Sequence, residues 1–126
     1  MDPCATPEPP HATLYARVHA YVGLHVRDPE LSPGRIAAAN GISERMLYKL
    51  YEARGRSLEQ VVIEQRLEGA RADLTSPTAQ HRTIAAVALS WGFTSPSFFS
   101  SRFHLAYGMT PREWRARHSQ RVPAAH

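Results

Sequence analysis

The stretch "VALSWGFTSPSFFSSRF", residues 87–103, decides the fold. Its residues 91–103 hold five aromatic and five hydroxyl side chains and no carboxylate. A half-buried strand would alternate apolar and polar residues, whereas Phe98 and Phe99 are adjacent, and Phe93, Phe99 and Phe103 recur at near-helical spacing. The stretch therefore predicts a turn followed by a helix, with the aromatic side chains in the core and the serines on the other face.

The same pattern occurs fifty-one residues earlier, in "IAAANGIS", residues 36–43. The aligned pairs are Ala37 with Ala88, Gly41 with Gly92, Ile42 with Phe93 and, after one extra residue in the second turn, Ser43 with Ser95, Leu47 with Phe99 and Tyr51 with Phe103. A short helix, a turn that glycine enters with positive φ, and a second helix that crosses the first make a helix-turn-helix. The chain is therefore predicted to contain two copies of this unit.

Cap and stop signals divide the whole chain into helices. Ser32-Pro33, Ser95-Pro96 and Thr110-Pro111 each place a hydroxyl N-cap before a proline at the first helical position. Glycines at positions 41, 55, 92 and 108 mark helix ends. The predicted helices cover residues 12–26, 33–40, 44–54, 58–75, 84–91, 96–107 and 111–119. No stretch resembles a paired strand, so we expect an all-α fold of about seven helices.

Length and charge set broad limits. The chain has 126 residues, enough for one domain with a modest core, and a net charge of +4. Residues 81–126 carry six arginines against a single carboxylate, Glu113, which leaves a net charge of −1 on residues 1–80. This basic end could bind DNA or an anionic membrane surface, or it could be a solvated basic tail without a partner. Charge alone leaves all three possibilities open.

The N-terminal stretch, the apolar runs and the cysteine count bear on where the protein is expected to lie in the cell. The N-terminal "MDPCATPEPPHA" has four prolines and no apolar run, which predicts a flexible leader over residues 1–11 and no signal peptide. Residues 120–126 are expected to form a basic tail. The longest fully apolar run, residues 84–89, is too short to cross a bilayer. A single cysteine, Cys4, excludes an internal disulfide and a cysteine-rich zinc site. We therefore expect a cytoplasmic, nucleoid-associated protein without a membrane partner.

The sequence lacks the motifs of enzymes. The seven histidines show no His-Glu-x-x-His or similar metal-binding spacing. There is no Gly-x-Ser-x-Gly turn around a nucleophile and no glycine-rich phosphate loop. The prediction is a protein that is not an enzyme and that uses no cofactor and no metal ion.

Two longer segments carry a family resemblance. They are "LSPGRIAAANGISERMLYKLYEARGRSLEQVVIEQRLEGARADL", residues 31–74, and "TIAAVALSWGFTSPSFFSSRFHLAYGMTPREWR", residues 83–115. Over residues 14–117 the chain resembles the DNA-binding domain of the AraC/XylS transcription regulators. The most specific matches are "GF-x-S-x-S-x-F-S" at 92–100, "G-M-T-P-x-E-W-R" at 108–115 and "R-L-x-x-A-R-x-x-L" at 66–74.

This resemblance implies an architecture and a function. It implies two helix-turn-helix subdomains joined by a long linker helix, residues 58–75, which together form a domain over residues 12–119. The two units would read two successive major grooves of double-stranded DNA. The family acts in bacterial transcription, typically as activators that contact RNA polymerase. Many members carry an effector-binding or dimerisation domain before this one, so an excised domain and a short stand-alone regulator both stay open. We expect binding as a monomer.

The helical wheel identifies the side chains of the first unit that can reach a groove. At about 100° per residue, Leu47, Leu50 and Tyr51 share the core face, whereas Arg45 and Lys49 point away from it. Exposed cations on a helix can be mere solubilising charge, but in a helix-turn-helix the second helix enters the groove, where Arg or Lys binds guanine edges. Tyr48 flanks this pair. In the resembling family, the positions of Arg45, Tyr48 and Lys49 contact bases or flanking phosphates.

In the second unit, serines occupy the corresponding face. Ser97, Ser100 and Ser101 are short, uncharged and able to donate or accept, which suits contacts with the DNA backbone. The family often has an arginine at the position of Ser101, whereas this chain has Arg102 one residue later, beside the core stripe. Three arginines are predicted to anchor phosphates: Arg102, Arg112 and Arg115. We therefore expect the first unit to supply most of the discrimination among bases.

A rival hypothesis remains at this level. The fold could be a helical protein-interaction module whose basic end docks an acidic partner, with helix-turn-helix units that no longer read DNA. DNA binding should weaken steeply with salt and prefer particular sequences, which distinguishes the two readings.

Overall fold

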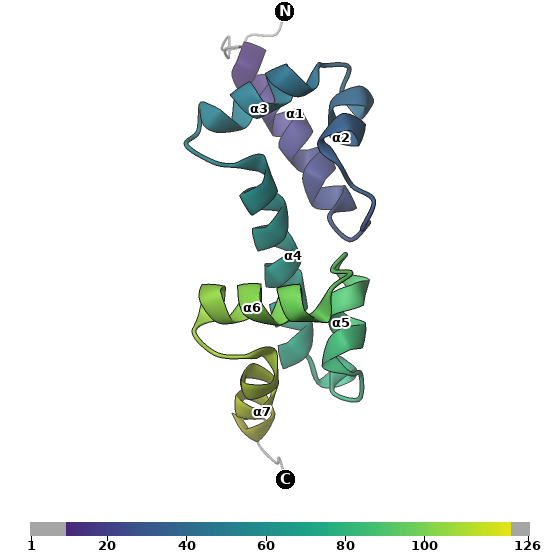
Figure 1. Ribbon diagram of the computed structural model, residues 1–126, viewed down its shortest axis with the longest axis vertical. Helices are drawn as coiled ribbons and strands as arrows, with labels where there is room; N and C mark the ends of the chain where they lie inside the picture. Colours follow the sequence, from purple (N-terminus) through teal and green to yellow (C-terminus); the bar gives the residue numbers. More distant parts are fainter. Residues whose placement is uncertain (1–9, 122–126) are drawn as a thin grey trace, which may run out of the picture. The chain divides into compact units, whose positions relative to one another are not determined.

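All seven predicted helices are present in the computed structural model, which describes residues 10–121 (Figure 1). They are α1 (Pro10–His25), α2 (Pro33–Ala39), α3 (Glu44–Glu52), α4 (Leu58–Thr75), α5 (Ile84–Ser90), α6 (Pro96–Tyr107) and α7 (Pro111–Arg121), with a short 3-10 helix, η1 (Pro77–Ala79), after α4. The described range contains no strand, so the predicted all-α class is confirmed.

The predicted boundaries differ from the structure by at most two residues, and within the chain the largest difference is at α3, which ends at Glu52 and not at the predicted residue 54. α1 begins at Pro10, so the last two residues assigned to the leader are helical, and α7 continues to Arg121, two residues beyond the predicted end. The rest of the predicted leader, with Cys4, and residues 122–126 of the predicted tail lie outside the described residues. Within residues 10–121 no helix has the length and the apolar character that a bilayer crossing needs.

The predicted N-caps are confirmed by their hydrogen bonds. The Ser32 hydroxyl accepts from the Arg35 backbone N–H, and the Ser95 hydroxyl accepts from the Phe98 N–H. At α7 the cap is reciprocal, because the Glu113 N–H donates to the Thr110 hydroxyl at 3.1 Å while the Thr110 N–H donates to the Glu113 carboxylate at 2.9 Å. Each such cap is worth about 1 kcal/mol of stability.

The chain divides into two compact units. Unit 1 contains the residues up to His25 together with Leu31–Val62, and unit 2 contains Val26–Glu30 together with the residues from Ile63 onward. The helix α4 belongs to unit 1 in its first five residues and to unit 2 thereafter.

The two units contain the same turn. In unit 1 the Ile42 N–H donates to the Ala37 carbonyl at 3.0 Å, and in unit 2 the Phe93 N–H donates to the Ala88 carbonyl at 3.1 Å. The turn glycines that precede them have φ values of 69° and 91°, which side chains with a Cβ rarely adopt. The internal repeat read from the sequence is therefore a structural repeat.

In unit 1 the helices α1, α2 and α3 pack against one another (Figure 1). Its buried side chains are Val18, Val22, Ile36, Ala37, Leu47, Leu50, Tyr51, Leu58 and Val61. The hydroxyl of Tyr51 is hydrogen-bonded to His19 Nδ1 at 3.0 Å, so the one polar group of this buried phenol has a partner. The apolar stripe of α3 is thereby fixed toward the core.

Unit 2 has an aromatic core. Its buried members are Leu67, Ala70, Leu74, Val87, Ala88, Phe93, Phe99 and Phe103, with Trp91, Tyr107 and Trp114 partly buried against them. The expectation that all the aromatic side chains of residues 91–103 build the core is wrong for Phe98, which is 45% exposed. Because Phe98 precedes Phe99 by about 100° around the helix, it cannot share the buried face.

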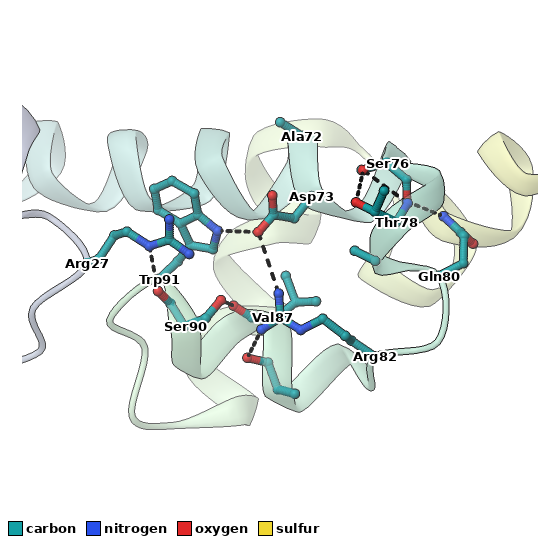
Figure 2. A network of polar contacts seen from close by, with 12 residues as sticks. Arg27, Ala72, Asp73, Ser76, Thr78, Gln80, Arg82, Val87, Ser90 and Trp91 are labelled. Atoms are coloured by element: carbon teal, nitrogen blue, oxygen red, sulfur yellow. Dashed lines mark hydrogen bonds and ion pairs between the residues drawn. The ribbon is translucent and has the colours of Figure 1, made fainter.

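The segment 26–30 is held in unit 2 by two arginines. Arg66 of α4 donates to the carbonyl oxygens of Val26 at 2.6 Å and Asp28 at 2.9 Å. The Arg27 guanidinium lies 4.0 Å from the ring centroid of Trp91 and donates to the Ser90 carbonyl (Figure 2). These contacts explain why a segment between α1 and α2 belongs to the second unit.

Candidate nucleic-acid interface

The helix α3 exposes cationic side chains on the face opposite its core stripe. Its start is fixed by Ser43, whose hydroxyl accepts from the Met46 N–H at 3.0 Å. Leu47 is fully buried, which turns the opposite side of the helix outward. Arg45 and Lys49 are both exposed there, one helical turn apart, as the wheel predicted. The two guanine-binding side-chain types therefore occupy the accessible face of the second helix of the motif.

Tyr48 is partly exposed and is tied to a residue that the sequence analysis did not identify. Its hydroxyl donates to Glu59 Oε2 at 3.1 Å. The other carboxylate oxygen of Glu59 accepts from the Ser57 hydroxyl at 3.2 Å. Desolvation and the neighbouring Glu59 carboxylate raise the pKa of Tyr48. No periodicity links positions 48 and 59, because the turn around Gly55, with φ 67°, brings them together.

The corresponding helix of unit 2, α6, exposes hydroxyl groups. Ser97 and Ser101 are exposed and Ser100 is half-buried. The twelve residues of α6 include no carboxylate, so nothing on this helix repels a phosphate. This matches the predicted face, except that two large apolar side chains also lie outward on α6: Phe98 and Leu105, the latter 76% exposed.

Arg102 and Arg112 remain available as cations. The Arg102 guanidinium lies 5.8 Å from the ring centroid of Phe98, one turn before it on α6. Arg112, in the first turn of α7, is exposed and lines a shallow hollow that Ser100 also lines. The fold therefore brings together two predicted DNA contacts, one from α6 and one from α7.

Arg115, a predicted phosphate contact, makes hydrogen bonds inside unit 2 that favour a structural role. Its guanidinium donates to the carbonyl oxygens of Ala79, the last residue of η1, and Arg82, which lies between η1 and α5. Desolvation by burial, with the charge of Arg82 nearby, lowers the pKa of Arg115. Nη1 and Nη2 each donate to a carbonyl oxygen inside unit 2 and Nε is buried, so Arg115 is not part of the proposed interface.

The described residues include no metal-binding cluster. Within residues 10–121, no group of three or more His, Cys, Asp or Glu side chains could hold a metal ion.

The chain is similar in sequence to bacterial transcription regulators. A family described as a helix-turn-helix domain matches residues 36–117. The transcriptional activator NphR of Rhodococcus sp is 31% identical over 104 residues, which are 82% of this chain and 30% of that protein. The XylDLEGF operon transcriptional activator of Pseudomonas putida is 32% identical over 84 residues, 66% of this chain and 26% of that protein. The chain thus spans about 30% or less of the length of these two relatives.

Solved structures share the fold. An AraC-type regulator from Chromobacterium violaceum aligns with a TM-score of 0.75 at 28% identity, covering 87% of this chain and 96% of that one. The DNA-binding domain of the global transcriptional factor AdpA, solved with a target DNA, aligns with a TM-score of 0.76 at 25% identity, again covering 87% and 96%. The family match, the repeated turn and these likenesses agree. The chain belongs to the AraC/XylS family of helix-turn-helix DNA-binding domains.

Proposed function

We propose that this chain is a sequence-specific DNA-binding domain of a transcription activator, and that it reads two successive major grooves with its two helix-turn-helix units. The observation that carries the proposal is the structural repeat: in each unit the second helix buries its apolar stripe and leaves cationic or hydroxyl side chains exposed. An α-helix fits the major groove, where such side chains meet base edges.

The proposed contacts differ between the units. In unit 1, Arg45 and Lys49 are the principal base readers, with Tyr48 beside them. In unit 2, Ser97, Ser100 and Ser101 contact the backbone, while Arg102 and Arg112 neutralise phosphates. Since cations specify guanine and serine tolerates every base, unit 1 supplies most of the discrimination and unit 2 mainly adds affinity.

The wider biological role follows from the relatives. Two of them are named transcriptional activators, which supports activation over repression. Contact with RNA polymerase, binding as a monomer and a place in the cytoplasm are parts of the same proposal, and we propose no catalytic activity. The proposed DNA-binding domain has Pro10 and Arg121 as the ends of its helical part, so Arg121, the one arginine of the predicted basic tail, belongs to α7.

The test is selection of bound sequences from random duplexes, followed by footprinting of the selected duplex. We expect two protected half-sites of unlike sequence, about 10 bp apart on one face of the DNA. Affinity should fall linearly on a log–log plot against salt concentration, with a slope that counts the neutralised phosphates.

A single protected segment, or an inverted repeat occupied by a dimer, would contradict the two-groove proposal. Binding that is insensitive to salt and to sequence would favour the rival protein-interaction module. A variant that combines Arg45→Ala and Lys49→Ala is the matched control, because it retains the buried face of α3 and loses only exposed side chains.

A further inference from the structure

Resting on the proposed function, we propose that Glu59 is a positioning residue that makes the Tyr48 hydroxyl a hydrogen-bond acceptor only, so that Tyr48 selects a base with an exocyclic amine in the major groove. Such bases are adenine and cytosine. Glu59 lies on α4, outside both helices of the first motif, and acts on the DNA through Tyr48.

The geometry at Tyr48 commits its one proton. The hydroxyl oxygen lies 3.1 Å from Glu59 Oε2, a donor–acceptor distance within the normal range. A phenol has a single O–H donor, whereas its oxygen retains lone pairs that accept. With the proton directed at a carboxylate, only the accepting capacity remains for a further partner.

The carboxylate is itself held in place. Its second oxygen accepts from the Ser57 hydroxyl at 3.2 Å, and Glu59 lies in the first turn of α4, where the helix dipole favours a negative charge. The Glu59 side chain is exposed, so no apolar packing fixes it and these polar contacts define its position. The raised pKa of Tyr48 agrees with a hydroxyl that keeps its proton.

An acceptor-only hydroxyl discriminates among base edges. In the major groove, adenine N6 and cytosine N4 present donors, whereas guanine N7 and O6 and thymine O4 present acceptors. The Tyr48 oxygen can therefore bond adenine or cytosine and repels the acceptor edges of guanine and thymine. Nearby on the same helix, Lys49 has only donors and complements this selection.

The commitment of the Tyr48 proton to Glu59 also excludes a phosphate contact by this hydroxyl. Phosphate oxygens only accept, so a hydroxyl whose proton is committed cannot bond them, and the Glu59 carboxylate would repel a phosphate placed beside Tyr48. The sequence had left Tyr48 open to either bases or flanking phosphates. The Tyr48–Glu59 hydrogen bond favours the bases.

The experiment measures binding of the full chain to a panel built on its selected duplex. Each position in the half-site of unit 1 is changed to all four base pairs, and to purine in place of adenine, which removes only the amine. The variants are Tyr48→Phe, Glu59→Ala, Glu59→Gln and the double variant Tyr48→Phe with Glu59→Ala. Glu52→Ala is the matched control, because it removes an exposed carboxylate from α3 and leaves Tyr48 and Glu59 intact.

The wild-type chain should prefer an amine-bearing base at one position by about fivefold, the scale of one hydrogen bond. Tyr48→Phe and Glu59→Ala should each reduce that preference to below about twofold, and the double variant should reduce it no further, because both changes remove the same interaction. Glu59→Ala and Glu52→Ala should both raise affinity for all duplexes, since each removes a negative charge. Glu59→Gln, whose amide oxygen still accepts, should retain more of the preference than Glu59→Ala.

Three results would overturn the inference. A base preference that survives Tyr48→Phe but disappears in Glu59→Ala would show that the Glu59 carboxylate itself contacts the base. A preference unchanged in both variants would mean that Tyr48 reads no base. A wild-type chain without sequence preference at any position would overturn the proposed function together with this inference. The other two results would overturn the inference alone.

Discussion

The indole ring of Trp91 fills the space in which Gly69 of α4 would carry a side chain. A Cβ atom on Gly69 would lie 2.3 Å from the six-membered ring of Trp91. The same indole donates from Nε1 to Asp73 Oδ2 at 2.7 Å, and Arg27 lies over its ring (Figure 2). Glycine in a helix costs about 1 kcal/mol relative to alanine, so its presence in α4 is explained by this contact.

Gly69→Ala should destabilise unit 2. The added methyl group overlaps a large, doubly anchored side chain that cannot yield without losing its hydrogen bond, so we expect a loss of about 1 to 3 kcal/mol in the free energy of unfolding. Urea denaturation measures it. Gly23→Ala, at an exposed position of α1, is the control and should stabilise by about 0.5 to 1 kcal/mol. Equal effects of the two substitutions would show that Trp91 does not determine the residue at position 69.

Arg115→Ala and Arg112→Ala should separate folding from DNA binding. Removal of the Arg115 guanidinium takes one donor from the Arg82 carbonyl and one from the Ala79 carbonyl, which keeps its bond from the Arg82 N–H. This should cost about 1 to 3 kcal/mol of stability and leave the salt slope of DNA binding unchanged. Arg112→Ala should lower the salt slope by about 1 with little change in the midpoint of thermal unfolding. The reverse pattern would restore Arg115 to the interface.

Arg45→Ala and Lys49→Ala should each weaken binding to the preferred duplex by about 1 to 3 kcal/mol and relax the base preference at one position. Both side chains are exposed, so neither change should lower stability. Titrations on matched and scrambled duplexes measure the effect. If both variants weakened the two duplexes equally, Arg45 and Lys49 would be phosphate contacts and the base readers would lie elsewhere.

Substitutions in α6 should have a different signature. Ser101→Ala should cost less than about 1 kcal/mol, since it removes at most one neutral hydrogen bond. Arg102→Ala should weaken all sequences alike and reduce the salt slope, because a phosphate contact carries no base information. Binding at two salt concentrations distinguishes the two variants. Loss of sequence preference in Ser101→Ala would contradict the assignment of base reading to unit 1.

The stability of unit 1 should fall in mild acid because of His19. Burial, and secondarily the charge of Arg56, lower the pKa of His19 from its ordinary value of 6.5, so the folded protein disfavours the imidazolium. Stability is then undiminished above pH 6.5 and decreases as the pH falls from there through the lowered folded value, since the unfolded chain binds the proton first. Denaturation midpoints over this range measure the effect.

The control for His19 is a histidine with no such burial. His19→Gln should flatten the decrease, because the titrating group is gone, whereas His104→Gln, at an exposed position of α6, should leave it unchanged. A decrease that persists in His19→Gln would assign the acid sensitivity to other groups.

The sequence by itself determined the helices, the repeat and the accessible faces. N-caps, helix-ending glycines and the apolar period act over three or four residues, so they can be read without knowledge of distant contacts. This is why the caps at Ser32, Ser95 and Thr110, the matched turns and the exposure of Arg45 and Lys49 were all predicted correctly.

Only the tertiary structure determined which polar groups already have a hydrogen-bond partner within the protein. The pairing of Tyr48 with Glu59 depends on the turn after α3, and the pairing of Arg115 with Ala79 and Arg82 joins residues more than thirty positions apart. The contact between the Trp91 indole and Gly69 likewise joins the turn after α5 to α4. A long side chain has many rotamers, and packing selects among them only when the elements around it are in place. Local sequence thus identifies which side chains can reach DNA, whereas tertiary contacts determine which of their donors remain free to bind it.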